Sequence, residues 1–131
     1  MRLLFLMEQP HQEPLGVGWL ISAVRAAGHG ADAVFFTDPR RAVRHAVTAR
    51  PDVLAFSAMT GAHRTYLALN REIKKNINTF SIFGGPHPTY SPDMAREPGV
   101  NAVCRGEAET ALPLLLDRLA QGGGAHLNTP N

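Results

Sequence analysis

Cysteine is nearly absent from this sequence, since Cys104 is the only one among 131 residues. A single cysteine excludes an internal disulfide framework and any multi-cysteine metal site formed by this chain. It also excludes an iron–sulfur cluster held by this chain alone, because such a cluster needs several cysteine ligands. The expected setting is therefore reducing and cytoplasmic. We expect Cys104 to be a small, buried apolar residue.

Long hydrophobic runs are also missing. No apolar run approaches the roughly 20 residues that span a bilayer, so we expect no membrane partner. The opening residues MRLLFLMEQP are too short an apolar segment for a signal peptide, because Glu8 interrupts them and no small-residue cleavage site follows. We interpret residues 2–7 as a buried first strand.

Charge of either sign is modest, with 18% charged residues and a net charge of +2. The basic clusters, Arg40-Arg41 with Arg44 and Lys74-Lys75, are typical of solvated helix faces. Aromatic residues make up only 7% of the chain and do not interleave with these clusters, so we expect no nucleic-acid partner. The 44% hydrophobic content is that of an ordinary globular domain.

Apolar strand-like runs alternate with helical patterns along the whole chain. The runs are RLLFLM (2–7), ADAVFF (31–36), DVLAFS (52–57), FSIFGG (80–85) and NAVCR (101–105). The helical patterns cover 16–28, 38–50, 63–75, 91–99 and 108–121. This alternation predicts one α/β domain over residues 1–121, with a parallel sheet and helices on both of its faces. The glycine-rich residues 122–131 have no periodicity and are predicted to be a linker or disordered tail.

Local signals mark several helix ends. Asp38 followed by Pro39 predicts an N-cap and a first helical residue. Gly28 is expected to end the first helix. Pro113 must lie near the first turn of the last helix, where a proline is tolerated. We expect Trp19 to belong to the core.

The loops that follow the predicted strands form the expected ligand site, because ligands of open parallel sheets bind at the carboxyl ends of the strands. These loops contain EQPHQEPLG, SAMTGAH, GGPHPTY and RGEAE. A phosphate-accepting receiver needs an acid pair after the first strand and an aspartate after the third, whereas this chain has only Glu8 and Ser57 there. A flavodoxin phosphate loop needs hydroxyl side chains after the first strand, and EQPHQEPLG has none.

Other common sites are also incomplete in the sequence. A dinucleotide-binding Gly-x-Gly-x-x-Gly would need a glycine where Ile21 stands after Gly16 and Gly18. No two histidines have metal-ligand spacing, which argues against a zinc or iron site formed by this chain alone. No nucleophile elbow surrounds Ser57, so a serine hydrolase is not indicated.

Four stretches together resemble one family. The stretches are EPLGVGWLISAVRAAGH, VLAFSAMTG, FGGPHPTYSP and GVNAVCRGEAE, and they run from Glu13 to Glu109. In their order and spacing they resemble the cobalamin-binding domain at the N-terminus of many radical S-adenosylmethionine enzymes. The resemblance implies a flavodoxin-like (Rossmann-like) three-layer α/β/α fold with a five-stranded parallel sheet of order 2-1-3-4-5. It implies cobalamin, as hydroxo- or methylcobalamin, as the cofactor.

The same resemblance implies a set of cobalamin-binding residues. They are Glu13, Pro14, Leu15, Gly16, Ser57, Ala58, Met59, Thr60, Gly61, His63, Gly84, Gly85, Pro86, His87, Pro88, Arg105, Gly106 and Glu107. Ser57 would bind the benzimidazole, Gly84 and Gly85 would clear a channel for the nucleotide tail, and Gly106 and Glu107 would flank it. Backbone N–H groups at the starts of the later helices would receive the tail phosphate. Ala108 departs from the family, which often has glycine there.

The cobalt ligand is left open by the sequence. Methionine-synthase-like domains carry Asp-x-His-x-x-Gly after the first strand, and His11 falls near the place of the ligating histidine. Gln9 and Pro14 replace the aspartate and glycine of that motif, and the aspartate would have oriented the imidazole. The radical enzymes generally lack this histidine, and a residue after the third strand faces the lower side of cobalt. Thr60 and His63 are the alternatives here.

The resemblance implies a cobalamin carrier rather than a complete enzyme. The chain would hold cobalamin base-off, without a histidine ligand, and present cobalt to a radical S-adenosylmethionine catalytic domain in cis or in trans, for methyl transfer. S-adenosylmethionine and a 4Fe–4S cluster would bind only to that other domain, since the Cys-x-x-x-Cys-x-x-Cys motif is not in this sequence. The alternatives are a flavin- or nucleotide-binding module of the same fold and a degenerate domain that only docks a partner.

Overall fold

A five-stranded parallel sheet organises the chain in the computed structural model, which describes residues 1–9 and 13–122. The strands are β1 (Arg2–Glu8), β2 (Gly30–Phe36), β3 (Val53–Ser57), β4 (Phe80–Gly84) and β5 (Ala102–Val103). The helices are α1 (Leu15–Ala26), α2 (Pro39–Ala49), α3 (His63–Lys74), α4 (Pro86–Tyr90), the 3-10 helix η1 (Pro92–Arg96) and α5 (Ala111–Ala120). The sheet order β2-β1-β3-β4-β5 confirms the predicted flavodoxin-like fold.

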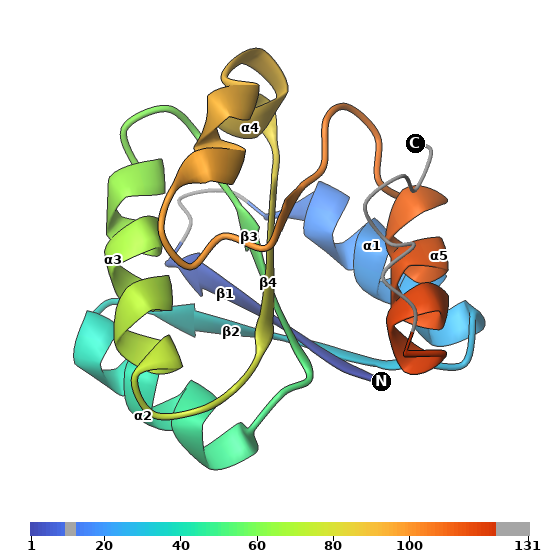
Figure 1. Ribbon diagram of the computed structural model, residues 1–131, viewed down its shortest axis with the longest axis horizontal. Coiled ribbons are helices and arrows are strands. Elements are labelled where there is room, and N and C mark those ends of the chain that lie inside the picture. The colour runs from blue at the N-terminus through green and yellow to red at the C-terminus, as the bar shows by residue number, and fades with distance from the viewer. Residues whose placement is uncertain (10–12, 123–131) are drawn as a thin grey trace.

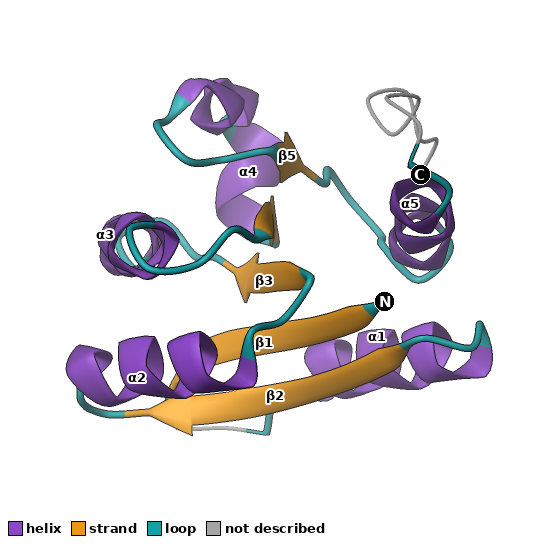
Figure 2. Ribbon diagram, turned by 60° about the horizontal axis from the view of Figure 1, so that its bottom comes forward, coloured by secondary structure: helices purple, strands orange, loops and turns teal. Residues whose placement is uncertain are grey.

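Helices cover both faces of the sheet, as Figures 1 and 2 show, with α2 and α3 on one side and α1 and α5 on the other. Two separate groups of buried residues reflect these layers. We call them the α2/α3 face and the α1/α5 face of the sheet. Because side chains alternate along a strand, each strand contributes to both faces.

The α2/α3 face is filled by large side chains. Phe56 and Phe83 extend from neighbouring strands and stack with their ring centroids 4.6 Å apart. The ring of Tyr66 from α3 lies 5.5 Å from that of Phe56. All three side chains are buried. Stacked aromatic pairs of this kind contribute about 0.5–1.5 kcal/mol beyond the burial of their area.

A buried polar network joins α3 to the edge of the sheet. Ser81 Oγ donates to Asn70 Oδ1 at 2.5 Å, and both residues are fully buried. Asn70 Nδ2 donates to the carbonyl of Gly99 at 2.9 Å. Asn101 Oδ1 accepts the backbone N–H of Ser81 at 2.8 Å. Each buried side-chain polar atom in the described residues has a hydrogen-bond partner. This network therefore avoids the free-energy cost of burying a polar atom without a partner.

The predicted helix-end signals are confirmed. The carboxylate of Asp38 accepts the backbone N–H of Arg40 at 3.0 Å, and Pro39 is the first residue of α2. Gly28 follows α1 with a φ of 91°, which glycine adopts without strain. Pro113 is the third residue of α5, where its missing N–H breaks no helical hydrogen bond.

The region after β4 differs from its prediction. The sequence predicts a polar loop followed by a helix over 91–99, whereas the chain forms the single turn α4 directly after Gly85 and then η1. Pro86 and Pro88 are tolerated because they lie in the first turn of α4, where N–H groups have no helical partner. The predicted last strand, 101–105, is shortened to the two residues of β5.

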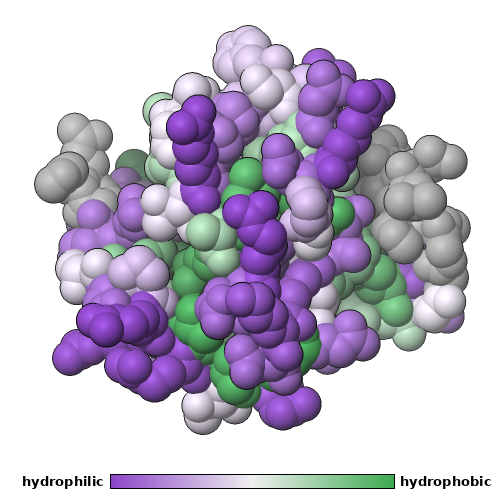
Figure 3. Space-filling model, turned by 60° about the vertical axis from the view of Figure 1, so that its left-hand side comes forward, coloured by the Kyte–Doolittle hydropathy of each residue, from purple (hydrophilic) through white to green (hydrophobic). Residues whose placement is uncertain are grey.

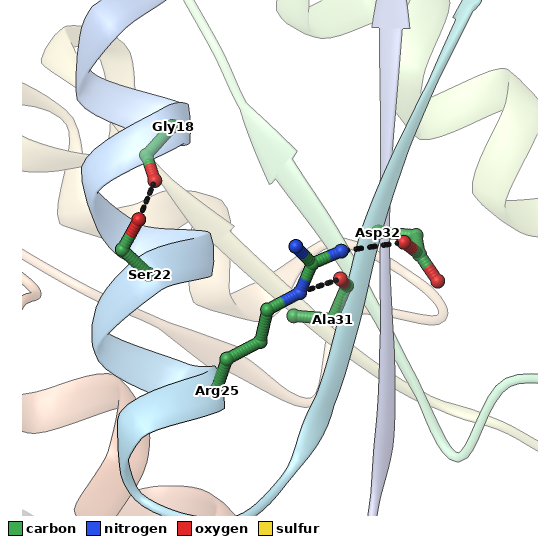
Figure 4. A network of polar contacts seen from close by, with 5 residues as sticks. All are labelled: Gly18, Ser22, Arg25, Ala31 and Asp32. Carbon is green, nitrogen blue, oxygen red and sulfur yellow. Dashed lines mark hydrogen bonds and ion pairs between the residues drawn. The ribbon is translucent and has the colours of Figure 1, made fainter.

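Trp19 is not a core residue, contrary to the sequence prediction, because 68% of it is exposed. Helix α1 turns Val17 and Val24 toward the sheet, and Trp19 lies on the opposite side of the helix. The polar side chains of α1 are bonded locally (Figure 4). Ser22 Oγ donates to the Gly18 carbonyl at 3.0 Å, and Arg25 binds β2 at the Ala31 carbonyl and the Asp32 carboxylate.

The outer surface over α2 and α3 is mainly hydrophilic, as the space-filling view shows (Figure 3). Arg40, Arg41 and Arg44 are exposed on α2, as predicted for a solvated helix face. Lys75, which directly follows α3, is exposed, whereas Lys74, the last residue of α3, is half-buried and donates to Asn101 Oδ1. Within residues 1–9 and 13–122, no helix has the length and apolar character needed to cross a membrane.

Candidate functional site

A cavity of about 260 Å³ lies at the carboxyl ends of the central strands, between the α1/α5 face of the sheet and the first turns of α1 and α5. Its lining residues come from β1, β3, β4, the β5–α5 connection and these two helices. They are Phe5, Met7, Pro14, Gly16, Val17, Leu20, Ala55, Phe56, Ser57, Ile82, Gly84, Gly85, Cys104, Gly106, Glu107, Ala108, Glu109 and Leu112. The volume is slightly below the roughly 300–1,000 Å³ of typical small-molecule sites, so this cavity suits one part of a larger ligand.

The cavity has an apolar inner wall and a polar rim. The lining residues that belong to the buried group of the α1/α5 face form the inner wall and are all apolar or thiol-bearing: Phe5, Met7, Val17, Ala55, Ile82, Cys104 and Leu112. The polar side chains are exposed or half-buried, namely Ser57, Glu107 and Glu109. An apolar ring system with polar substituents at one end would match this distribution of polarity.

The two successive glycines at the end of β4, Gly84 and Gly85, are needed for different structural reasons. A Cβ on Gly84 would lie 3.8 Å from Cys104 Cβ, an ordinary contact beside the cavity. A Cβ on Gly85 would lie 3.0 Å from the Ala58 nitrogen and 3.1 Å from Ser57 Oγ, and the φ of Gly85 is 95°. Gly85 is therefore required by the close approach of the β3–α3 loop. The sequence interpretation, in which both glycines only clear a ligand channel, is incomplete for Gly85.

Backbone hydrogen bonds hold the β3–α3 loop against the start of α4. The Ala58 N–H donates to the Gly84 carbonyl at 2.8 Å, and the His87 N–H donates to the Ala58 carbonyl at 2.9 Å. Pro86 and Pro88 have no N–H, so the start of α4 offers no free backbone donor. The expectation that the later helices receive a phosphate on backbone N–H groups is wrong for α4.

The β5–α5 connection is tied to α4 through Thr89. The Gly106 N–H donates to Thr89 Oγ1 at 3.1 Å, and that hydroxyl donates to the Gly85 carbonyl at 2.8 Å. Arg105 Nε donates to the Thr89 carbonyl at 3.3 Å. These bonds hold Gly106 at the rim of the cavity. They direct the side chain of Arg105 toward α4, and Arg105 does not line the cavity.

Two histidines meet at the carboxyl ends of β3 and β4, although their sequence spacing gave no sign of it. The rings of His63 and His87 stack with centroids 3.7 Å apart and an angle of 11° between their planes. His87 Nδ1 and Thr60 Oγ1 lie 3.0 Å apart. The Gly61 N–H donates to His63 Nδ1 at 3.0 Å, which makes Nδ1 an acceptor and places the ring proton of neutral His63 on Nε2.

Burial lowers the pKa of His63, and the neighbouring His87 and Arg64 lower it further. Protonated His63 would also lose the Gly61 hydrogen bond, because Nδ1 would then carry a proton. Stacked rings cannot both direct a nitrogen lone pair at one ion. Consistent with this, no three His, Cys, Asp or Glu side chains in the described part of the chain are grouped to hold a metal ion.

Cys104 is buried, as predicted, and forms part of the inner cavity wall. Burial raises the pKa of its thiol, and the negative charge of Glu109 raises it further. The thiol is therefore neutral at physiological pH and is a weakly polar part of that wall.

The structure brings only some of the sequence-predicted residues to the cavity. Those in the lining are Pro14, Gly16, Ser57, Gly84, Gly85, Gly106 and Glu107. Outside the lining lie Glu13, Leu15, Ala58, Met59, Thr60, Gly61, His63, Pro86, His87, Pro88 and Arg105. Of these, Met59 is 59% exposed beside the stacked histidines, and Leu15 points outward on α1. His11 lies outside the described residues.

Sequence reasoning missed the inner wall. Phe5, Met7, Ala55 and Ile82 were interpreted only as parts of strands, and Cys104 only as a core residue. The available signal was the presence of small residues near the strand ends, since Ala55 and Cys104 belong to the buried group of the α1/α5 face. Glu109 and Leu112 could have been found from their position in the first turn of α5 or just before it.

The chain matches the family model described as the B12 binding domain over residues 9–116. It is 34% identical over 119 residues to an uncharacterized methyltransferase of Pyrococcus horikoshii, with 83% of this chain and 25% of that protein covered. It is 35% identical over 100 residues to 2-(S-pantetheinyl)-carbapenam-3-carboxylate methyltransferase of Streptantibioticus cattleyicolor, with 72% of this chain and 14% of that protein covered. The chain thus spans a quarter or less of these relatives.

Two solved structures share the fold at low sequence identity. The response regulator domain of Thermotoga maritima CheB has a TM-score of 0.60 and 16% identity, with 92% of this chain and 96% of that domain covered. The pseudo-receiver domain of the CikA protein has a TM-score of 0.58 and 17% identity, with 92% and 94% covered. At these identities the likeness concerns the arrangement of strands and helices alone.

Proposed function

This chain belongs to the family of B12-binding domains, and from that premise we propose that it holds cobalamin base-off at the carboxyl edge of its sheet and presents cobalt to a radical S-adenosylmethionine catalytic domain. The observation that carries the proposal is the cavity between the sheet and the first turns of α1 and α5. Its volume suits the nucleotide tail and is too small for the corrin ring as well.

The residues around the cavity fit such a tail. The position of a Cβ on Gly84 lies between the strand end and Cys104, where a larger side chain would occupy the cavity. Ser57 ends β3 at the rim and has a hydroxyl that can donate to a ring nitrogen of the tail base. Gly106 and Glu107 flank the opening from the β5–α5 connection, consistent with their predicted role.

We place the tail phosphate near the first turn of α1. That turn has no acidic residue, and Gly16 is exposed at the cavity rim. The positive end of a helix dipole favours a phosphate there. The approach to α5 is less favourable, because two acidic residues, Glu107 and Glu109, precede that helix, whereas one, Glu13, precedes α1.

The corrin would lie over the ends of β3 and β4, beside the β3–α3 loop. His63 offers no free lone pair at Nε2 while Gly61 donates to its Nδ1, which supports binding without a ligand from His63. We propose that Thr60 and the stacked His63 and His87 bound the space below the cobalt. They would restrict access of water to it rather than ligate the metal.

Bound cobalamin would supply a cobalt that can carry a methyl group, and we assign no reacting side chain to residues 1–9 and 13–122 of this chain. The two curated relatives are named as methyltransferases and are several times longer than this chain. We therefore propose methyl transfer by a catalytic domain, with its S-adenosylmethionine and 4Fe–4S cluster bound outside this chain. That domain would be joined in cis or supplied in trans.

A binding experiment tests the proposal. The purified chain is mixed with hydroxocobalamin, desalted and examined by absorption spectroscopy, and we expect a retained corrin spectrum. Reduction to cob(II)alamin followed by electron paramagnetic resonance should show no nitrogen coupling from a histidine. An eluate without corrin would sink the proposal, and a chain purified with a yellow chromophore would favour the flavin alternative instead.

Gly84→Leu provides the decisive variant, because its side chain would enter the cavity. Gly18→Leu is the matched control, since a Cβ at Gly18 meets no atom within 4 Å and Gly18 does not line the cavity. We expect retention of cobalamin to be lost in Gly84→Leu and kept in Gly18→Leu. Circular dichroism verifies that both variants fold.

A further inference from the structure

We infer that the cavity selects the lower base of the cobamide, accepting an apolar fused-ring base such as dimethylbenzimidazole and discriminating against a purine such as adenine. The inference rests on the proposed function, because it assumes that the base enters this cavity. It goes further by assigning specificity to the inner wall and, within that wall, to Cys104.

The inner wall offers almost nothing that can form a hydrogen bond. Phe5, Ile82 and Leu112 are hydrocarbon side chains, and all are buried. Behind them, β1 pairs with β3 as far as Phe5 and Ala55, and β3 pairs with β4 as far as Ser57 and Gly84, which engages backbone groups of these strands. A polar atom of a ligand placed against this wall would lose its water without gaining a partner.

One hydroxyl stands at the rim, on Ser57. Dimethylbenzimidazole in a cobamide that is base-off has one unsubstituted ring nitrogen, and its two methyl groups are apolar. One donor at the rim and an apolar interior therefore match its polarity. Adenine has additional ring nitrogens and an exocyclic amine, and the deep wall has no groups to pair with them.

Glu109 is the polar side chain closest to the inner wall among those that the structure places in the cavity lining and near Cys104. It is half-buried in the cavity lining, and its charge raises the pKa of the Cys104 thiol, so it lies near the inner wall. Its carboxylate can accept a hydrogen bond from an amine but cannot donate one to a ring nitrogen. A purine would still leave ring acceptors unpaired against this wall.

Cys104 sets the polarity at the point where the wall meets Gly84. Its thiol is a weak hydrogen-bond donor, and it is neutral because burial and Glu109 raise its pKa. Exchange of the thiol for the hydroxyl of serine would add a strong donor and acceptor at nearly the same volume. The residue is therefore a specificity position whose effect can be measured without changing the shape of the cavity.

The test is a set of titrations of the whole chain with three corrinoids, followed by absorption spectroscopy. These are hydroxocobalamin, the corresponding cobamide with adenine as lower base, and cobinamide, which has no nucleotide tail. We expect hydroxocobalamin to bind at least about tenfold more tightly than the adenine cobamide, since several polar atoms would be buried unpaired. Cobinamide should bind more weakly than hydroxocobalamin as well.

Variants of Cys104 sharpen the test. In Cys104→Ser we expect the preference for hydroxocobalamin over the adenine cobamide to fall severalfold, whereas Cys104→Ala should retain it. A second measurement uses the single thiol of the chain: hydroxocobalamin should slow the reaction of Cys104 with a thiol reagent, and cobinamide should not.

The outcomes separate the inference from the proposed function. Equal affinities for hydroxocobalamin and the adenine cobamide would overturn the inference while leaving cobalamin binding intact. Tight binding of the adenine cobamide that is lost in Glu109→Ala would overturn it too, and would show that the carboxylate reads the purine amine. Absence of binding by every corrinoid would instead refute the proposed function.

Discussion

The two faces of the sheet are packed in opposite ways. On the α2/α3 face, Phe56 and Phe83 stack against each other and leave no room for a ligand. On the α1/α5 face, the same strands pair Ala55 with Ile82 and Ser57 with Gly84, and a cavity opens beside these residues. One sheet thus supports a filled core on one side and a binding site on the other.

This difference separates residues that stabilise the fold from residues that shape the site. A filled face contributes packing energy that is lost when a side chain is truncated. A hollow face forgoes some of that energy so that a ligand can provide the missing contacts. The buried polar network of Asn70 and Ser81 also lies on the filled side, where it fixes α3 against β4.

The largest expected effect comes from making the filled face hollow. Phe83→Ala should lower the free energy of unfolding by about 3–5 kcal/mol, because it removes a fully buried ring and leaves a cavity. Ile82→Ala, next in sequence but on the hollow face, should cost near the lower limit of about 2 kcal/mol. Urea unfolding followed by circular dichroism measures both. Equal costs would contradict the contrast between the faces.

The second comparison concerns the adjacent glycines. Gly85→Ala should lower the free energy of unfolding by about 1–3 kcal/mol, because alanine is strained at a φ of 95° and its Cβ would press on the Ala58 backbone. Gly84→Ala should cost less than about 1 kcal/mol, since its Cβ finds an ordinary contact with Cys104. Thermal and urea unfolding of both variants provide the measurement, and the reverse order would refute the assignment.

A larger side chain on the hollow face should change the free energy of unfolding less than the preceding substitutions do. Its main effect should be on cobalamin binding. Ala55→Val adds two methyl groups beside the cavity, so the free energy of unfolding should stay equal or rise by up to about 1 kcal/mol. Retention of hydroxocobalamin should decrease in the same variant. Ala46→Val on the filled face is the control and should cost about 1–3 kcal/mol through overpacking.

The smallest effect concerns protonation of His63. Its pKa lies below the ordinary value of about 6.5, so the folded chain binds this proton less tightly than the unfolded chain. The stabilising contribution is therefore complete above about pH 6.5 and is lost as the pH falls through that value toward the lowered pKa. His87 and Arg64 disfavour the protonated ring, and Glu97 favours it.

An NMR titration of the imidazole signals measures this prediction, with assignment through a His63→Gln variant. We expect the His63 midpoint below 6.5, and a higher midpoint would contradict the stacked arrangement with His87. The exposed His45 on α2 offers a matched control, since His45→Gln should leave the His63 midpoint unchanged.

Much of the fold could be predicted from local patterns. The alternation of apolar runs with helical periodicity located four of the five strands and four of the helices closely, and the signals at Asp38 and Gly28 marked helix ends correctly. The region after β4 was less predictable. Its prolines suggested a loop, but Pro86 and Pro88 fit the first turn of α4 because no N–H is needed there.

The sequence predicted where the site lies, but it did not predict the residues of the inner cavity wall. The loops at the carboxyl edge could be found because parallel strands end there together, and the resemblance to cobalamin-binding domains supplied the sheet order and the expected residues. The inner wall and the stack of His63 on His87 could not be found in this way, because they join residues from separate elements.

By itself the sequence determined which segments become strands and helices, because periodicity and capping act over a few neighbouring residues. Along β3 it also placed the small Ala55 and Ser57 on the side opposite Leu54 and Phe56. Only the tertiary structure decided that the small side remains open, since this depends on how closely α1 and α5 approach the sheet. The same holds for Gly85, whose need for glycine arises from the contact between two loops that packing brings together.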